Sequence, residues 1–259
     1  MAAPPKRRFH FHASGHALSG EFLRPIRESI EVQAATTLPT IGGHGDARVE
    51  QFRHRHFVSF NAGYSHVSGS KYHKDDKDFY TTLVTATVEN LNFLDVVTAD
   101  RVVSRVSSYH ILPNNESHFS FVGAQFLGLK VAGHPVEIVL NDRLFAHLDT
   151  FDKVKKELET DKDFKKMAED PFHTGTRSKV GEDHGEILCS IVKELKTDAP
   201  GVTVEGHALV VPHFGRVYVG EALLGPCKRT LTMLRLELGS PVEGSGTISQ
   251  VVGNGATWP

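Results

Sequence analysis

The sequence predicts a mainly β protein with a sandwich or barrel-like architecture, and a β-solenoid is the alternative. Three observations support this prediction. Apolar and polar residues alternate with a period of two over many short segments, which is typical of half-buried strands. Turn-forming residues separate these segments, and β-branched residues are frequent inside them. A single stretch, 144–167, has instead the apolar spacing of a helix.

The predicted strands of the first block are short and lie between residues 9 and 140. Phe9 and Phe11 share one face of the first strand, and His10 and His12 share the other. In the third strand the alternation continues without interruption from residue 49 to residue 60. We place the strands of this block at 9–14, 30–34, 49–60, 83–91, 96–106, 119–126 and 130–140.

A charged α-hairpin is predicted as an insertion at 142–170. Its apolar residues form a narrow helical stripe, and thirteen of the nineteen residues from 152 to 170 are charged. Pro171 ends the second helix, because proline cannot continue the helical hydrogen-bond pattern. Residues 173–186 show no periodicity, so we predict a long loop there.

Strands resume after this loop and form the second block. The first is predicted at 187–195, a hairpin follows with arms at 207–211 and 216–223, and the last strand covers 230–238. The sequence shows no repeat of fixed period. No Pro- or Ser-rich linker separates the two blocks. We therefore interpret residues 1–259 as a single β-rich domain.

Composition limits the classes of protein to which the chain can belong. Hydrophobic residues make up 39% and charged residues 23%, which fits a globular protein rather than a disordered one. The net charge of −2 gives no basic field, so no nucleic-acid partner is expected. No apolar run is long enough to span a membrane. Cys189 and Cys227 are the two cysteines, which excludes a disulfide scaffold and a Cys-rich zinc module.

The first residues do not have the pattern of a secretion signal. Lys6-Arg7-Arg8 is followed by histidines and small polar residues instead of an apolar core. We expect a cytoplasmic protein, or a secreted protein whose leader has already been removed.

The common catalytic motifs are absent from the sequence, which lacks phosphate-binding, dinucleotide-binding, zinc-protease and Gly-x-Ser-x-Gly patterns. An S-x-x-K spacing at Ser68–Lys71 has no helix around it, so we assign it to a loop. We therefore expect a non-catalytic structural or binding protein without a cofactor. Its partner would be another protein or a second copy of the chain, because exposed sheet edges favour pairing.

The alternative hypothesis is a metal-dependent hydrolase or oxygenase on a β-barrel, and it depends on the sixteen histidines of the chain. His54 and His56 lie two residues apart on the apolar face of a predicted strand, so both imidazoles could reach one zinc or iron ion. His44 and Asp46, from the preceding Gly-rich turn, are further candidate ligands. A pair of hydrogen-bonded core histidines is the other interpretation of His54 and His56.

Three segments resemble a known family. Residues 86–102 (ATVENLNFLDVVTADRV) are similar to the strand–turn–strand motif of the bacterial "choice-of-anchor" surface domains. SHFSFV at 117–122 and LKVAGHPV at 129–136 resemble the next strands of that family in the same order, and Leu38-Pro39-Thr40 also has a counterpart. The resemblance covers about a third of the chain. It implies a β-rich, non-catalytic domain of bacterial origin and assigns no catalytic residue.

Overall fold

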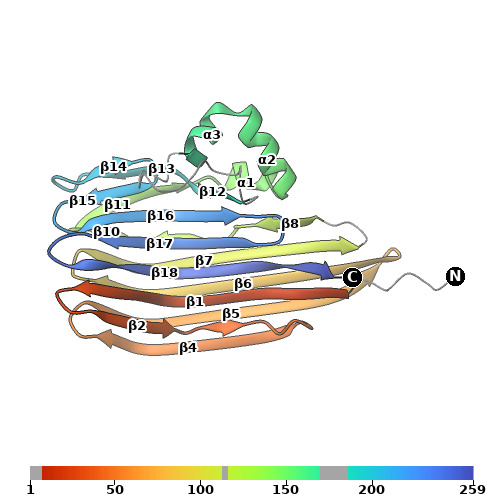
Figure 1. The fold of residues 1–259 in the computed structure, drawn as a ribbon, viewed down its shortest axis with the longest axis horizontal. Coiled ribbons are helices and arrows are strands. Elements are labelled where there is room, and N and C mark those ends of the chain that lie inside the picture. The colour runs from red at the N-terminus through yellow and green to blue at the C-terminus, as the bar shows by residue number, and fades with distance from the viewer. Residues whose placement is uncertain (1–7, 113–115, 170–185, 259) are drawn as a thin grey trace.

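The protein is mainly β, as the sequence predicts, and its two antiparallel sheets form a sandwich-like structure (Figure 1). The computed structural model describes residues 8–112, 116–169 and 186–258. Each sheet has nine strands, and neither closes into a barrel within the described residues. The period-two alternation places one face of most strands in a shared core, whereas β16 is buried on both faces from Val217 to Ala222.

Sheet A has the strand order β14-β15-β16-β17-β18-β1-β2, with β12 paired to β16 and β3 paired to β1. Its two longest strands, β18 and β1, pair with each other although they are far apart in the sequence, as Figure 1 shows. The strands of sheet A are β1 (Arg8–Arg24), β2 (Glu28–Gln33), β3 (Thr36–Thr37), β12 (Ile187–Ser190), β14 (Thr203–Glu205), β15 (Ala208–Val211), β16 (Gly215–Leu224), β17 (Arg229–Leu238) and β18 (Glu243–Trp258).

Sheet B has the order β13-β11-β10-β7-β6-β5-β4, with β8 and β9 both paired to β7. Consecutive hairpins build its main part, so β4 to β7 are neighbours in both sequence and space. The strands of sheet B are β4 (Gly43–His54), β5 (Val58–Lys74), β6 (Lys77–Phe93), β7 (Val97–Leu112), β8 (Ser117–Ser120), β9 (Gln125–Leu127), β10 (Lys130–Val131), β11 (His134–Leu140) and β13 (Val192–Thr197).

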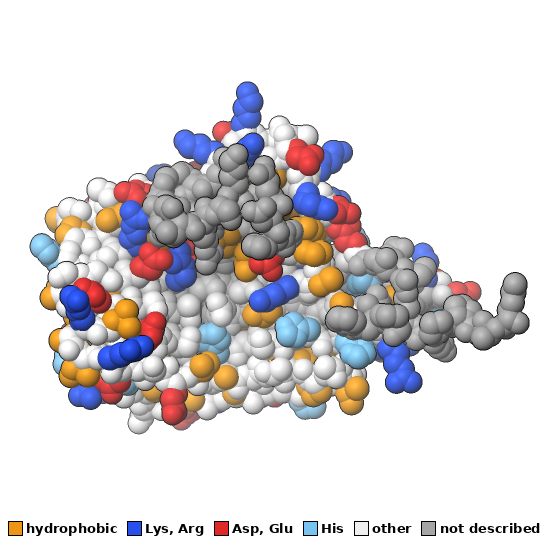
Figure 2. Space-filling view, viewed as in Figure 1, with side chains coloured by type: hydrophobic (Ala, Val, Ile, Leu, Met, Phe, Trp, Pro, Cys, Tyr) orange, Lys and Arg blue, Asp and Glu red, His pale blue; other side chains and the backbone are white. Residues whose placement is uncertain are grey.

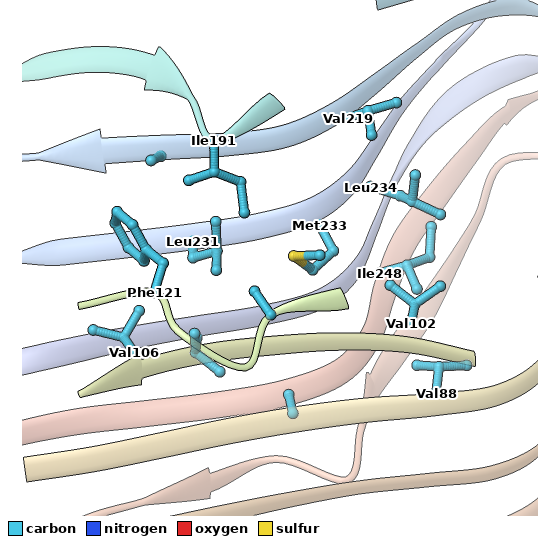
Figure 3. Close-up of a cluster of buried hydrophobic side chains, with 14 of the residues drawn as sticks. Val88, Val102, Val106, Phe121, Ile191, Val219, Leu231, Met233, Leu234 and Ile248 are labelled. Atoms are coloured by element: carbon cyan, nitrogen blue, oxygen red, sulfur yellow. The ribbon is translucent and has the colours of Figure 1, made fainter. Parts of the chain in front are cut away.

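The core lies between the two sheets and is built from alternate residues of their strands. Val88, Val102 and Val106 of sheet B lie opposite Leu231, Leu234 and Ile248 of sheet A, among other buried side chains (Figure 3). All these side chains belong to one cluster of buried hydrophobic residues.

A hydrogen-bonded serine joins the two sheets inside this core. Ser249 on β18 is fully buried, and its hydroxyl donates to the carbonyl oxygen of Ala86 on β6 at 2.8 Å. The Ser249 hydroxyl oxygen in turn accepts a hydrogen bond from the backbone N–H of Ser104 on β7, also at 2.8 Å. The buried hydroxyl is therefore satisfied by the opposite sheet.

Three helices occupy the segment that was predicted as a two-helix hairpin. They are α1 (Asp142–His147), α2 (Phe151–Thr160) and α3 (Lys162–Glu169), and they gather at one side of the sheets (Figure 1). Thr150 caps α2 by accepting a hydrogen bond from the backbone of Lys153 at 3.4 Å. None of the helices in the described residues is long and apolar enough to cross a membrane. Most of the predicted loop 173–186 lies outside the described residues, which resume at residue 186.

Several predicted strand boundaries are wrong. The stretch 49–60 is not one strand but a hairpin, because β4 ends at His54 and β5 begins at Val58. Arg55 has a φ of 53°, and the N–H of Phe57 donates to the carbonyl of His54 at 3.1 Å, so the chain turns there. The stretch 187–195 divides between β12 of sheet A and β13 of sheet B. The S-x-x-K residues lie in β5 rather than in a loop.

Candidate functional site

A depression of about 300 Å³ lies on the outer face of sheet B, across β5, β6 and β7. Its outward side chains are mostly hydroxylic, with one guanidinium and one phenol. Among the described residues that line it there is no Asp or Glu. The outward side chains are Ser68 and Ser70 of β5, Thr81 and Leu83 of β6, and Arg105, Ser107 and Tyr109 of β7.

Strand register brings these side chains together. Ser70 pairs with Thr81, and Thr81 pairs with Tyr109, so the three form one row across the sheet. The next row contains Ser68, Leu83 and Ser107. Alternation turns the residues between them, such as Val84 and Val106, into the core.

The hydroxyl groups of the first row are partly ordered by one another. The oxygen atoms of the Ser70 and Thr81 side chains lie 2.8 Å apart, which is a hydrogen bond across two strands. A hydroxyl has one donor and two acceptor positions, so both groups keep hydrogen-bonding capacity for a ligand. The depression therefore offers a fixed array of neutral polar groups on a rigid sheet.

Tyr109 lies at the end of this row that is next to β8. The ring of Tyr109 stacks on the imidazole of His118, with centroids 4.4 Å apart and an interplanar angle of 2°. His118 Nδ1 lies 2.7 Å from a carboxylate oxygen of Asp149, and Lys153 Nζ donates to the other oxygen at 2.6 Å. The stack and its supporting ion pairs hold Tyr109 in place, although 40% of its surface stays exposed.

The electrostatics at this end keep the phenol protonated. Burial and the negative charge of Asp149 both raise the pKa of Tyr109 above its usual value. Burial alone would raise the pKa of Asp149 as well, but hydrogen bonds from Lys153 and His118 outweigh burial and lower it. At neutral pH the Asp149 carboxylate is therefore charged, and the Tyr109 hydroxyl is a neutral donor and acceptor.

A second aromatic pair lies beyond the same end of the depression. Tyr72 of β5 stacks on Phe79 of β6, with centroids 4.8 Å apart and an interplanar angle of 5°. Tyr72 is 47% exposed, and its register position is one row beyond Ser70. Exposed aromatic faces beside hydroxyl groups suit a ligand that has both apolar and polar surfaces.

The structure does not bring the four predicted metal ligands together. His44 and His54 are ten residues apart on the extended strand β4, a separation of about 33 Å. His54 Nε2 lies 3.5 Å from Glu28, and Asp46 lies 2.6 Å from Nδ1 of His66. His56 is exposed in the turn after β4 and contacts the Phe57 ring.

The described residues contain no group of three or more His, Cys, Asp or Glu side chains arranged to hold a metal ion. The prediction grouped His54 with His56 because it treated 49–60 as a single strand, and it added His44 and Asp46 from an expected turn that is in fact part of β4. The turn at residues 55–57 separates His56 from the face that carries His54.

The depression was not found by sequence reasoning, but its signal is present in the sequence. Hydroxylic or aromatic residues occupy alternate positions at Ser68 and Ser70 and again at Ser107 and Tyr109. Such alternation predicts that each pair shares a face of its strand. The register that aligns β5, β6 and β7 is a tertiary property, and it is what joins the pairs into one surface.

Comparison with known proteins gives a family match without a functional one. The model of the family described as Domain of unknown function (DUF8256) matches residues 9–183 and 152–225 of the chain. No curated protein and no solved structure matches the chain. The resemblance to choice-of-anchor domains stays a prediction. Residues 86–102 do lie in β6, β7 and the turn between them, but any β-hairpin would place them so.

Proposed function

The chain belongs to the DUF8256 family, and from its own surface we propose that it is a non-catalytic binding protein whose ligand is a glycan. The glycan would lie in the depression on the outer face of sheet B. The observation that carries this proposal is the combination of aligned hydroxyl groups with an exposed, stacked aromatic ring at one end.

The chemistry of sugars matches this combination. A sugar ring has apolar C–H faces and a rim of hydroxyl groups that both donate and accept hydrogen bonds. Tyr109 supplies an aromatic surface for a C–H face, and the Ser and Thr hydroxyls can donate or accept according to the sugar. Three adjacent strands span about 10 Å, so the surface is wide enough for a chain of sugar units rather than one small molecule.

The rigid sheet supports binding because little has to be ordered when the ligand arrives. Ser, Thr and Tyr side chains have few rotatable bonds, and the Tyr109 ring is already fixed by His118. Preorganisation of this kind lowers the entropic cost of association.

The lining favours binding over hydrolysis. Glycoside hydrolysis ordinarily uses two carboxyl groups on either side of the scissile bond, and the described lining holds neither Asp nor Glu. A nucleophilic serine requires a base within hydrogen-bond distance, whereas the Ser70 hydroxyl is hydrogen-bonded to the hydroxyl of Thr81, which is not a base. These features support a ligand that is held without being cleaved.

Affinity electrophoresis in gels that contain soluble polysaccharides tests the proposal. We expect xylan, β-glucan, dextran, alginate or polygalacturonate to retard the wild-type protein. Tyr109→Ala should weaken that retention about tenfold or more, because it removes the aromatic surface. Leu127→Ala is the matched control, because Leu127 is also exposed on sheet B but lies outside the depression. Absence of retention in every gel, or equal retention of the two variants, contradicts the proposal.

Self-association is the second candidate, and it depends on one sheet edge. β4 pairs with β5 on one side and has no other paired strand in the described part of the chain. A twelve-residue edge strand offers backbone N–H and C=O groups to a second copy.

A further inference from the structure

We infer that the glycan carries anionic groups, carboxylate or sulfate, and that Arg105 is the residue that recognises them. This inference rests on the proposed function and adds the chemical class of the ligand. It depends on three features of Arg105: its position in the depression, its lack of an acidic partner, and the packing of its side chain against Gly123.

Arg105 lies among the hydroxyl groups of the depression. It is exposed on β7, two residues before Ser107, and pairs in register with Thr85 of β6. Its guanidinium is always charged and presents several N–H donors in one plane. A carboxylate or sulfate on a sugar in the depression would therefore meet a charged donor group as well as neutral hydroxyls.

Arg105 has no carboxylate partner among the described residues, in contrast to Arg101 and Arg48 of the same sheet. Arg101, on the same strand, lies 3.5 Å from Glu89 and donates to the Tyr64 hydroxyl at 2.8 Å. Arg48 pairs with Glu50 at 2.8 Å. No ion pair or hydrogen bond of the Arg105 guanidinium is found in the described residues.

The acidic groups of the surrounding surface are already engaged. Glu89 is paired with Arg101, and Asp46 is paired with His66 at 2.6 Å. Because His66, Thr85 and Arg105 follow one another in register, Asp46 lies three strands away from Arg105. The depression therefore contains one cation without a compensating anion in its described lining.

The side chain of Arg105 packs against the backbone of Gly123. A Cβ atom at Gly123 would lie 2.9 Å from Cδ and 3.3 Å from Nη1 of Arg105, so the arginine passes directly over the glycine backbone. Gly123 has a φ of 96°, which residues with a side chain rarely adopt. The close packing restrains the long side chain near the depression, which lowers the cost of holding an anion.

Binding measured by calorimetry on matched pairs of polysaccharides tests this inference. Polygalacturonate is compared with its fully methyl-esterified form, which has the same sugars without charge, and dextran sulfate is compared with dextran. We expect wild-type protein to bind the charged member of at least one pair about tenfold more tightly. The pair that shows the preference identifies carboxylate or sulfate as the recognised group.

Variants assign the preference to a residue. Arg105→Gln should remove the preference for the charged polysaccharide, and Arg105→Lys should retain part of it because a point charge remains. Lys130→Gln is the control, because it removes one exposed positive charge from the same sheet outside the depression. Raising the salt concentration should weaken binding of the charged member selectively.

The outcomes separate this inference from the proposed function. Equal affinity of wild-type protein for charged and neutral members, with retention still lost in Tyr109→Ala, overturns the inference and leaves the proposed function standing. The same preference in Arg105→Gln as in Lys130→Gln also overturns it. Absence of binding to every polysaccharide overturns both.

Discussion

Glu221 is a buried carboxylate on β16 that keeps its charge because donors surround it. Arg235 on β17 donates to its two oxygens from Nε at 2.6 Å and from Nη2 at 2.8 Å, and His207 Nε2 lies 3.4 Å away. The guanidinium carbon of Arg235 also lies 3.7 Å from the centre of the Tyr218 ring. Burial alone would raise the pKa of Glu221, but the hydrogen bonds from Arg235 and His207 lower it.

The lowered pKa of Glu221 predicts a loss of stability in acid. A carboxyl group whose pKa is lower in the folded state stabilises the fold above its unfolded pKa, about 4.3 for Glu. That contribution disappears as the pH falls from there through the folded pKa. We expect the free energy of unfolding, measured in urea, to decrease between pH 5 and pH 3.

Glu221→Gln isolates this contribution. At pH 7 the variant leaves Arg235 with Glu237 as its remaining carboxylate partner, so the loss of the charged hydrogen bonds to Glu221 should cost about 1.5–3 kcal/mol of unfolding free energy. The difference in unfolding free energy between wild type and variant should narrow as the pH falls below the unfolded pKa of about 4.3 and through the lowered pKa of folded Glu221. Glu205→Gln is the control, because Glu205 is exposed on β14 of the same sheet. A difference in unfolding free energy between wild type and Glu221→Gln that stays constant from pH 7 to pH 3 contradicts the stabilising role of the charged Glu221 carboxylate.

Single residues also show what the sequence could and could not predict. The alternation of Phe9 and Phe11 with His10 and His12 correctly predicts which pair is buried and which is exposed. His54 and His56 do not follow the same rule, because a positive φ at Arg55 breaks the strand that should have carried both. Arginine tolerates that conformation poorly, so nothing in its side chain indicates a turn.

At the scale of elements, α2 and α3 belong to the same hydrophobic cluster as the sheets. Phe151 and Val154 of α2 and Phe164 and Ala168 of α3 are buried in it. Phe151 also lies near the fully buried Arg229, whose guanidinium carbon is 5.9 Å from the centre of its ring. Burial lowers the pKa of Arg229 to about 10.

Replacing residues 150–170 with a short Gly/Ser linker tests how far the sheets depend on these helices. We expect the far-ultraviolet circular dichroism of the β sheets to persist, because both sheets are built outside this segment. The free energy of unfolding should decrease by several kcal/mol, since each large buried apolar side chain contributes about 1.5–3 kcal/mol.

A point variant in α2 measures how much unfolding free energy one buried side chain of these helices contributes. Val154→Ala, at a fully buried position of α2, should cost more unfolding free energy than Glu159→Ala on the exposed side of the same helix. Complete loss of the β signal after the deletion would mean that the helices are required for the sheets to form.

The lengths of the strands explain why the depression could not be predicted. The strands predicted at 83–91 and 96–106 are parts of β6 and β7, which extend over Lys77–Phe93 and Val97–Leu112. The added portions carry Thr81, Thr82, Ser107, Ser108 and Tyr109, which lack the apolar alternation used to recognise a strand. Pairing with β5 and with each other extends these strands, and this pairing is a property of the folded sheet.

At the scale of the whole molecule, the exposed edge of sheet B has features that limit self-association. Gln51 of β4 has a φ of 50°, and it is not paired with β5 between the Glu50–Ala62 and Phe52–Phe60 pairs, so the edge strand is irregular there. Arg48, Glu50 and Arg53 add charges to the same strand. Positive and negative side chains are also mixed over the face seen in Figure 2, so no field of one sign attracts or repels a second copy.

Removing the protecting charges from this edge tests the second candidate function. We expect light scattering of the variant Arg48→Val with Glu50→Val to give a mass that rises with concentration more steeply than that of wild type. Lys156→Val with Glu159→Val, on the exposed side of α2, changes the same kinds of charge away from any edge. If both variants and the wild type stay strictly monomeric at high concentration, self-association through β4 is wrong.

The pairing of β1 with β18 has a consequence for the time at which sheet A can form. His16 of β1 and Thr247 of β18 lie on adjacent strands and are 231 residues apart in the chain. A ribosome that adds about 5–20 residues per second needs roughly 10–50 s to make the second strand after the first. Until then the apolar side of β1, with Phe9, Phe11 and Phe22, lacks its long neighbour. Sheet B, whose main hairpins are local, can assemble during this interval, and sheet A is completed last.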